Sequence, residues 1–388
     1  MTDKLKKRFR TEIVLTPEQQ NNFFRTRGVC RFVYNFYLAH NQELYKQGKP
    51  FMSARTFSVW LNNDYLPKNL DKMWIKEVSS KAVKQSMENA HTAFLRFFNK
   101  HSAFPKLKKK GRNEPKVYFV KNSKTDCLCE RHRIKIPTFG WCKLKEKGYI
   151  PTTKDGYSVV SGTLDYVAGR FYVSVLVDVP DSSTVKNGGV GVGIDLGIKD
   201  FAICSDGVTF KNINKSTKVK KLEKRLWREQ RRFSRKLQNK KKGKSTQNKN
   251  IQKQRERIQR LHQTLANIRN DYVKQTVSRI VKTKPSYVTI EDLNIKGMMK
   301  NRHLAKAVAN QNFYEFRKIL TEQCHQNGIE IRVVDRWYPS SKTCNCCGKI
   351  KADLKLSDRL FKCECGYVAD RDYNASLNLR DAKTYKKA

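Results

Sequence analysis

The chain has 388 residues, which is enough for two or three domains that each bury a core. It carries 81 Lys and Arg against 35 Asp and Glu, a formal net charge of +46. Such self-repulsion is unusual in a metabolic enzyme, so the charge favours a polyanion, above all a nucleic acid, as the partner. Aromatic residues still make up 11% of the chain, which excludes a disordered basic tail and predicts that most of it folds.

No feature of the sequence indicates a membrane partner. The chain lacks a run of 18 or more apolar residues, and neither end carries a lipidation signal. The first 20 residues contain basic side chains but no apolar core followed by a small-residue cleavage site. We therefore expect a cytosolic protein.

The first half of the chain predicts two different folds in succession. Residues 1–14 are expected to supply one strand, and Thr16 followed by Pro and Gln is the signature of a capped helix start. Residues 15–105 carry apolar and aromatic side chains at helical spacing, which predicts a helical domain. In residues 106–185, short β-branched and aromatic runs are separated by Gly and Pro, so we expect a small β-barrel that includes the first strand.

A run of lysines opens the expected barrel. Lys108, Lys109 and Lys110 lie in the basic loop that follows the last N-terminal helix. We expect these three side chains to contact the nucleic acid that the net charge implies.

Residues 186–336 predict an α/β domain. The run GVGVGID, residues 189–195, is apolar enough for a buried strand, and a tight turn at Gly197–Lys199 leads into a second, antiparallel strand. Further strands are expected at Tyr287–Glu291 and Ile329–Asp335, with a helix between them.

A pair of basic helices, residues 215–282, interrupts this domain. Residues 211–270 hold 22 Lys and Arg against three acids, while leucines recur at helical spacing and predict one apolar seam. We expect the charged face to bind nucleic-acid phosphates; the alternative is a solvated surface that keeps the protein soluble. The candidate contacts are Lys220, Lys221, Lys224 and Arg225.

Three acidic residues lie where an RNase H-like fold places a metal site. Asp195 and Glu291 each end a strand, and Asp372 opens the last helical segment. Mg²⁺ prefers oxygen ligands, and two such ions about 4 Å apart cleave phosphodiesters. Taken singly, each acid has an alternative as a turn residue or helix cap. Asp292 is expected to point away from Glu291 by strand alternation, and Asp370 is the nearest competitor of Asp372.

Five of the eleven cysteines are concentrated near the C-terminus. Cys344 and Cys347 form a C-x-x-C pair and Cys363 and Cys365 a C-x-C pair, each followed by glycine, which is typical of tetrahedral zinc. Four thiolates leave no open position, so we expect a structural Zn²⁺. The second pair is one residue shorter than usual, and Cys346 is a spare thiol that offers an alternative ligand.

Four motifs occur in the order GIDLGIKDFA, TIEDLNIKGM, YPSSKTCNCCG and FKCECGYVADRDYNASLN. In combination they resemble the TnpB (OrfB) proteins of bacterial insertion sequences, RNA-guided nucleases related to type V CRISPR effectors. The similarity extends over nearly the whole chain and includes the helical segment RGVCRFVYNFYL. The C-x-C pair departs from the family pattern, but this departure does not touch the three acids.

The resemblance implies a RuvC nuclease domain of the RNase H-like α/β class. This domain would comprise residues 186–336 and a C-terminal helix within 369–388, split by a zinc-ribbon insertion at 337–368. A helical recognition lobe and a wedge-like β-barrel would precede it.

The resemblance also implies an RNA-guided DNA endonuclease encoded by a transposon. Asp195, Glu291 and Asp372 match the family's catalytic triad, which uses Mg²⁺ or Mn²⁺ beside one structural Zn²⁺. The guide RNA would derive from the transposon end, and the target would be double-stranded DNA beside a short motif, at the nucleoid in the bacterial cytosol. The alternatives are a nuclease-inactive guided repressor, which would be expected to lack triad acids, and a transposase that acts directly on transposon ends.

Lys81 and Gln85 are candidates for reading the motif beside the target. They lie four residues apart on the helix expected to begin near Ser79, so they share one face. Gln pairs bidentately with adenine, and the resemblance implies motif contacts from a Lys-x-x-x-Gln pair on the matching helix. The alternative is a pair of merely solvated side chains.

Overall fold

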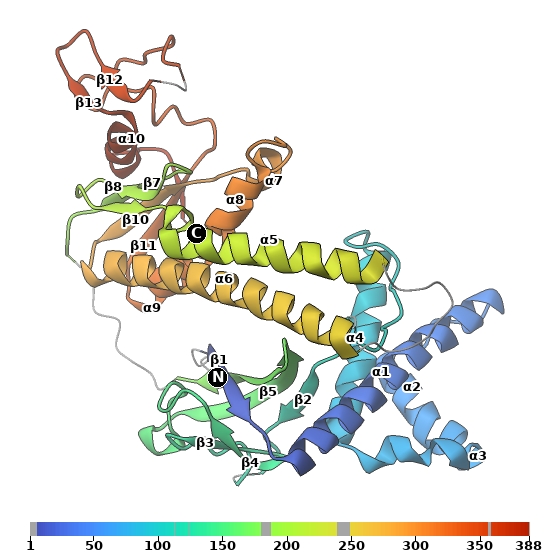
Figure 1. Ribbon diagram of the computed structural model, residues 1–388. Coiled ribbons are helices and arrows are strands. Elements are labelled where there is room, and N and C mark those ends of the chain that lie inside the picture. The colour runs from blue at the N-terminus through green and yellow to red at the C-terminus, as the bar shows by residue number, and fades with distance from the viewer. Residues whose placement is uncertain are drawn as a thin grey trace. The chain divides into compact units, whose positions relative to one another are not determined.

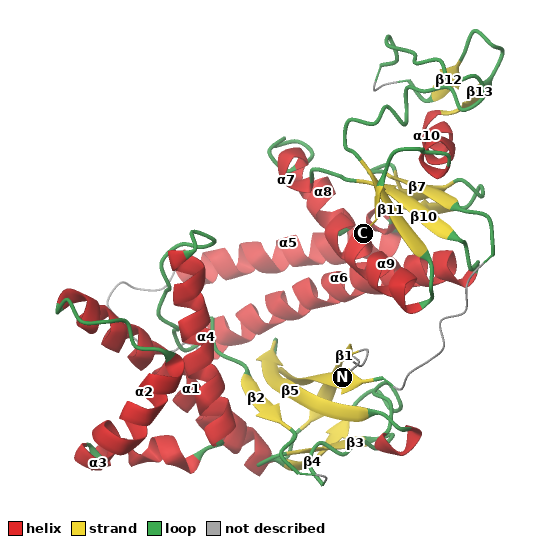
Figure 2. Cartoon of the chain, turned by 180° about the vertical axis from the view of Figure 1, so that it is seen from behind, coloured by secondary structure: helices red, strands yellow, loops and turns green. Residues whose placement is uncertain are grey.

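The structure, a computed structural model, describes residues 6–111, 113–123, 125–179, 188–238, 249–355 and 358–387. The chain forms two compact units, Met1–Ser182 and Ser183–Ala388, whose elements are labelled in Figure 1 and seen from behind in Figure 2. Among the described helices, none combines the length and apolar character that crossing a bilayer requires.

A strand and a group of helices open the first unit. Thr16 caps the first helix as predicted, because its hydroxyl accepts from the Gln19 backbone N–H while the Gln19 side chain accepts from the Thr16 N–H. Tyr37, Phe57 and Met87 belong to one buried cluster formed by α1, α2 and α4. The elements are β1 (Lys6–Val14), α1 (Pro17–Lys46), α2 (Ala54–Trp60), α3 (Leu66–Lys68) and α4 (Ser80–Phe98).

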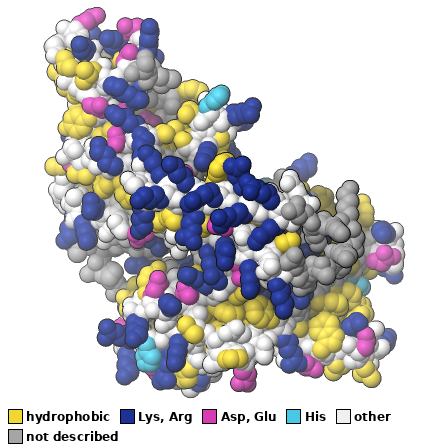
Figure 3. All heavy atoms as spheres, in the orientation of Figure 1, with side chains coloured by type: hydrophobic (Ala, Val, Ile, Leu, Met, Phe, Trp, Pro, Cys, Tyr) yellow, Lys and Arg dark blue, Asp and Glu magenta, His cyan; other side chains and the backbone are white. Residues whose placement is uncertain are grey.

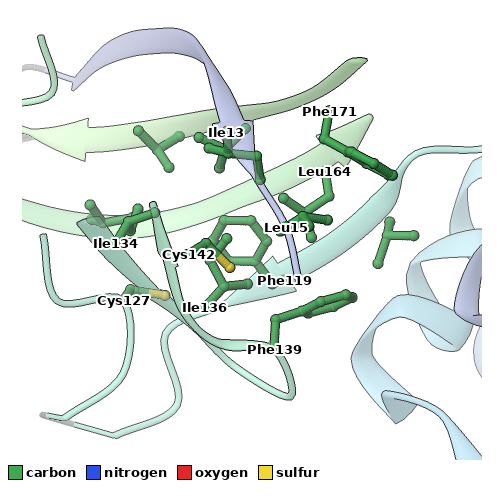
Figure 4. Packing of buried hydrophobic residues seen from close by; sticks show 14 of the residues in the cluster. Ile13, Leu15, Phe119, Cys127, Ile134, Ile136, Phe139, Cys142, Leu164 and Phe171 are labelled. Carbon is green, nitrogen blue, oxygen red and sulfur yellow. The ribbon is translucent and has the colours of Figure 1, made fainter. Parts of the chain in front are cut away.

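A six-stranded antiparallel sheet completes the first unit, in the order β2-β5-β6-β1-β4-β3. Phe119 of β2 and Ile134 of β3 come from opposite ends of this order yet pack in one core with Cys127 and Cys142 (Figure 4), so the sheet curls around that core. In the described residues β2 and β3 are not paired with each other, so the hydrogen-bonded order is linear. The strands are β2 (Val117–Val120), β3 (Arg133–Ile136), β4 (Gly140–Leu144), β5 (Ser158–Val167) and β6 (Arg170–Asp178).

The second unit is built on a six-stranded mixed sheet in the order β14-β11-β10-β7-β8-β9. The three central strands β7, β10 and β11 are parallel, and the outer strands run antiparallel to their neighbours. The antiparallel pair β7 and β8 and the turn between them are as predicted. The strands are β7 (Val192–Leu196), β8 (Asp200–Cys204), β9 (Thr209–Lys211), β10 (Tyr287–Glu291), β11 (Glu330–Val334) and β14 (Lys386–Lys387).

Residue alternation in β7 assigns different helices to the two faces of this sheet. Val192 and Ile194 pack into the core that side chains of α6 (Lys249–Lys282) and α9 (Phe313–Gln326) share. On the opposite face, a Cβ on Gly193 would lie 2.0 Å from the Ser376 carbonyl oxygen and 2.3 Å from the Arg380 nitrogen, both of α10. Glycine therefore permits the α10 backbone to lie directly on β7. The helices are α7 (Ile295–Met298), α8 (Ala305–Gln311), α9 (Phe313–Gln326) and α10 (Arg371–Arg380).

A small two-stranded sheet lies in the chain between β11 and α10. It consists of β12 (Leu360–Lys362) and β13 (Val368–Asp370), which pair antiparallel. Phe361 of β12 is fully buried.

The predicted pair of basic helices is present as α5 (Thr217–Gln238) and α6 (Lys249–Lys282). The residues that join them, 239–248, lie outside the described residues. The expected apolar seam is only partly buried: Leu261 and Leu265 of α6 are buried, whereas Leu237 of α5 is 44% exposed. Polar bonds supplement the seam, because Arg269 of α6 donates to Glu223 of α5 at 2.9 Å.

We expect Gly193→Ala to displace α10 from the sheet. The added methyl group has no space between the two backbones, and overpacking of this kind costs about 1–3 kcal/mol. Thermal unfolding should therefore show a less stable protein. Gly188→Ala is the matched control, because a Cβ at Gly188 meets nothing within 4 Å; equal stability of the two variants would contradict the close approach.

Candidate active site and metal centre

Asp195 and Glu291 lie side by side at the carboxyl ends of two parallel strands. β7 and β10 pair in register up to Ile194 and Ile290, so the next residues of the two strands are neighbours. Adjacent strands are about 4.8 Å apart. By alternation both carboxylates are on the face of Gly193, which α10 covers.

Asp372 reaches the same place from the first turn of α10. The helix passes over Gly193 at Ser376, and Asp372 lies one helical turn before Ser376. Its Oδ1 accepts from Arg371 Nη2 at 3.0 Å, and its Oδ2 lies 3.8 Å from Arg359 Nη1. Asp372 is therefore near enough for its charge to act on Asp195, as the charge of Glu291 also does. Among the described residues the three acids do not form a group with all ligand atoms within 4.8 Å of one another, as the four cysteines do.

Burial and mutual repulsion act on two of these carboxylates. Burial raises the pKa of Asp195 well above its usual range, and the charges of Glu291 and Asp372 raise it further, against an opposing effect of Arg371. Burial also raises the pKa of Glu291, although a hydrogen bond from Ser340 opposes the shift. A divalent cation would relieve this repulsion, so these partly buried acids have the chemistry that a hard, oxygen-binding metal ion requires.

Two neighbouring acids have structural partners instead. Asp370 is the N-cap of α10, where its Oδ1 accepts from the backbone N–H groups of Asp372 at 3.0 Å and Tyr373 at 3.1 Å. Asp292 pairs with Arg317 of α9 at 2.5 Å, on the face away from α10, as strand alternation predicts.

Sequence reasoning missed three polar residues beside the carboxylates. Ser340 donates its hydroxyl to Glu291 Oε1. Asn374 and Asn378 of α10 are buried and bond the segment that leads into the first cysteine pair. The signal was available, because Ser340 lies in YPSSKTC and both asparagines lie in DYNASLN, where polar residues recur on a helix.

The four predicted cysteines form one cluster. The Sγ atoms of Cys344 and Cys365 are 3.7 Å apart, those of Cys347 and Cys363 are 3.5 Å apart, and all four lie within 4.8 Å of one another. Cys346 is exposed and is not part of the group. Such a cluster is able to hold a metal ion with tetrahedral sulfur coordination, despite the short C-x-C pair.

The thiolate form that binds a metal is favoured at Cys363. A hydrogen bond from the Cys365 backbone lowers the pKa of Cys363 to about 7, and bonds from the neighbouring thiols act in the same direction. Bonds with the neighbouring thiols raise the pKa of Cys365 to about 12, so Cys363 loses its proton more readily than Cys365 does.

The motif-reading candidates lie on α4. Lys81 is exposed, and Gln85, one turn later, is half-buried and donates to Asn89 Oδ1 at 3.2 Å. The Gln85 amide therefore has a local partner that a base edge would have to displace.

The three loop lysines differ in their surroundings. The Lys108 backbone is held by Asn35 through bonds of 2.8 and 2.9 Å, and its ammonium lies 4.6 Å from the centre of the Tyr34 ring. Burial lowers the pKa of Lys108. Lys109 and Lys110 are exposed, so they are the more accessible of the three for an external phosphate.

The basic face of α5 is open to solvent. Of the residues of α5, Val219 is buried, whereas Lys220, Lys221, Lys224 and Arg225 are exposed. In the described part of the chain these four make no ion pair. Figure 3 shows blue Lys and Arg side chains gathered over this helix with few acidic ones among them.

Three family models match the chain. The OrfB_IS605 family, described as "Probable transposase", matches residues 174–302, and "Cas12f1-like, TNB domain" matches residues 313–379. A "Helix-turn-helix domain" of OrfB_IS605 proteins matches residues 1–50. In the structure, described residues 6–50 instead form β1 and the single long helix α1.

Two relatives that the chain matches over most of their length are named for the same function. "Putative RNA-guided DNA endonuclease" of Streptomyces pristinaespiralis is 30% identical over 389 residues, covering 98% of this chain and 90% of the relative. "Putative RNA-guided DNA endonuclease InsQ" of Escherichia coli K12 is 29% identical over 378 residues, covering 93% and 88%.

A solved structure shares the fold. The Cas12f1 chain in a complex with sgRNA and target DNA superimposes with a TM-score of 0.57, at 16% identity, over 99% of this chain and 100% of that one. The likeness therefore covers both units of the protein.

We expect the purified protein to contain about one equivalent of zinc. Cys347→Ser should lower this content and destabilise the ribbon, because the folding of such insertions is coupled to metal binding. Metal analysis of unchelated protein measures the first effect and thermal unfolding the second. Cys346→Ser is the matched control and should keep its zinc. Loss of zinc in Cys346→Ser but not in Cys347→Ser would show that Cys346, and not Cys347, is the metal ligand.

Proposed function

Because the chain belongs to the TnpB family of RNA-guided DNA endonucleases, we propose that it cleaves target DNA at Asp195, Glu291 and Asp372 under the direction of a guide RNA. The observation that carries this proposal is the approach of three partly buried acids from β7, β10 and α10, since the charges of Glu291 and Asp372 both act on Asp195. Buried like charges destabilise a fold, so their concentration marks a functional site.

The strand order supports an RNase H-like, RuvC-type assignment for this unit. β9, β8 and β7 form an antiparallel meander, and β10 and β11 extend it in parallel from the β7 edge. In open α/β sheets, ligands bind beyond the carboxyl ends of the parallel strands. Asp195 and Glu291 occupy those ends of the two adjoining central strands.

Divalent Mg²⁺ or Mn²⁺, when bound, supplies an activated water and neutralises the leaving oxygen in phosphodiester hydrolysis. The three carboxylates would hold the ions. The charges of both Glu291 and Asp372 act on Asp195, since both raise its pKa. Arg371 and Arg359 limit the repulsion at Asp372 until a cation binds.

The guide RNA in this proposal comes from the transposon end, and the target is double-stranded DNA beside a short motif. The exposed cations of α5 support binding of a nucleic-acid backbone, which is recognised by charge and not by sequence. A structural Zn²⁺ at the four cysteines would stabilise the insertion between β11 and α10.

Copurification tests the guidance step directly. Protein isolated from its host should carry a discrete RNA, and the complex should cut DNA that matches this RNA. Cleavage of transposon ends by RNA-free protein would favour the direct transposase instead.

We expect Asp195→Ala, Glu291→Ala and Asp372→Ala to abolish Mg²⁺-dependent cleavage while RNA and target binding persist. Each change removes a metal ligand but leaves the basic surface intact. Cleavage and mobility-shift assays measure the two properties separately. Asp370→Ala is the control: it removes a helix cap worth about 1 kcal/mol and should retain cleavage. Robust cutting by any of the three variants would refute the assignment.

Replacing Lys220, Lys221, Lys224 and Arg225 together by Gln should weaken binding of RNA or heteroduplex. The slope of log K against log salt should become shallower by about one unit for each phosphate that the protein no longer neutralises. Lys72→Gln is a suitable control, because Lys72 already pairs with Asp71. An unchanged slope would indicate that the four cations serve solubility.

Gln85→Ala should relax the preference at one or two positions of the flanking motif. Loss of a bidentate pair with a base costs about 1–3 kcal/mol of discrimination, while non-specific affinity should change little. Cleavage of a library with randomised flanks measures the preference. Lys81→Ala is expected to weaken binding more uniformly, and Lys72→Ala, which lies outside α4 and removes a side chain paired with Asp71, is the control. A wild-type motif profile in both Lys81→Ala and Gln85→Ala would place the reader elsewhere.

A further inference from the structure

A short segment, residues 338–345, connects the cysteine cluster to the carboxylates. It leaves the sheet after β11 and ends in the first cysteine pair. Within it, Ser340 is 5% exposed and donates its hydroxyl to Glu291. The segment therefore touches Glu291 through Ser340 and enters the cysteine cluster at Cys344.

Two buried asparagines of α10 hold this segment in place. Asn378 Nδ2 donates to the Ser340 carbonyl at 2.7 Å and to the Thr343 carbonyl at 2.6 Å. Asn374 Nδ2 donates to the Thr343 carbonyl at 2.7 Å. Thr343 directly precedes Cys344, so these bonds end one residue before the cysteine cluster.

The acceptor atoms of the same asparagines are also used. Asn374 Oδ1 accepts from the Asn345 backbone N–H at 3.2 Å, and Asn378 Oδ1 accepts from Asn345 Nδ2 at 3.3 Å. Asn374 and Asn378 are 0% and 4% exposed, so their bonds are shielded from water. A buried, fully engaged polar network of this kind specifies one arrangement, because loss of a partner leaves an unsatisfied group.

The same helix carries Asp372, two residues before Asn374. The position of α10 along β7 is limited by contact with Gly193, so the network fixes the segment relative to both carboxylates. Glu291 is held by the Ser340 hydroxyl, and Asp372 is held by the helix to which Ser340 is bonded.

We propose that Ser340, Asn374 and Asn378 are positioning residues that hold Glu291 and Asp372 for metal binding, and that they couple the four-cysteine cluster to the nuclease site. The inference rests on the proposed function of these carboxylates. Partners that orient metal ligands typically contribute 10- to 100-fold to metal affinity. A cysteine cluster that loses its metal would then weaken a second metal site whose own ligands are unchanged.

Mn²⁺ binding to the full chain, loaded with zinc and free of RNA, tests the first part. Electron paramagnetic resonance of free Mn²⁺ gives the dissociation constant, and Asp195→Ala supplies the baseline without the carboxylate site. Ser340→Ala should weaken Mn²⁺ binding about tenfold or more, and cleavage by this variant should recover at high Mg²⁺. Ser340→Thr, which keeps the hydroxyl, should bind as wild type does.

Ser376→Ala is the matched control for Ser340→Ala. Ser376 of α10 is buried, as Ser340 is, but its hydroxyl donates to the Tyr373 carbonyl of its own helix. It should keep wild-type Mn²⁺ affinity. Wild-type affinity in Ser340→Ala, or an equal loss in Ser340→Thr or Ser376→Ala, would overturn the positioning role.

Cys347→Ser tests the coupling. It should weaken Mn²⁺ binding in the folded fraction although the carboxylates are unaltered, and Cys346→Ser should not. Undiminished Mn²⁺ affinity in zinc-depleted Cys347→Ser would overturn the coupling. Absence of Mn²⁺ binding in the wild type would be a different failure, since it would overturn the proposed function and this inference with it.

Discussion

The close approach of α10 to β7 is the constraint on which the second unit depends. A helix backbone lies against a strand backbone only where no side chain intervenes, and Gly193 provides that place. Glycine is required at position 191 as well, because a Cβ there would lie 2.0 Å from the Tyr287 ring. The Tyr287 hydroxyl in turn donates to the Arg380 carbonyl of α10. The close approach fixes where Asp372 lies relative to the strand that carries Asp195.

The resulting group of acids lowers the stability of the folded protein but suits the binding of a cation. Burial and like charges raise the pKa of Asp195, so the fold carries an electrostatic cost that a bound cation would offset. Two acids next to the site have other roles: Asp370 caps a helix, and Asp292 pairs with Arg317. Asp372 also has cationic partners, Arg371 and Arg359, but its charge still acts on Asp195.

Both units have apolar cores and strongly basic surfaces. In each unit, apolar side chains bury a sheet against itself or against helices, and the excess of cations remains on the outside. α5 shows this most clearly, because Val219 is its buried residue while Lys220 and Lys224 stay in solvent. The net charge of +46 is therefore compatible with ordinary cores, since it is carried where water and nucleic acid screen it.

The sequence by itself determined the local features, because their causes are local. Helix capping at Thr16, the β7–β8 hairpin, the basic helices and the spacing of Cys344 and Cys347 each follow from a few adjacent residues. It also indicated Asp195, Glu291 and Asp372 as a set, through strand ends and motif resemblance. Only the tertiary structure decided that Cys365, and not Cys346, joins the cluster, and that Ser340 and Asn378 connect it to Glu291. Those interactions join residues 16 to 49 positions apart, where side-chain geometry depends on packing that no local pattern encodes.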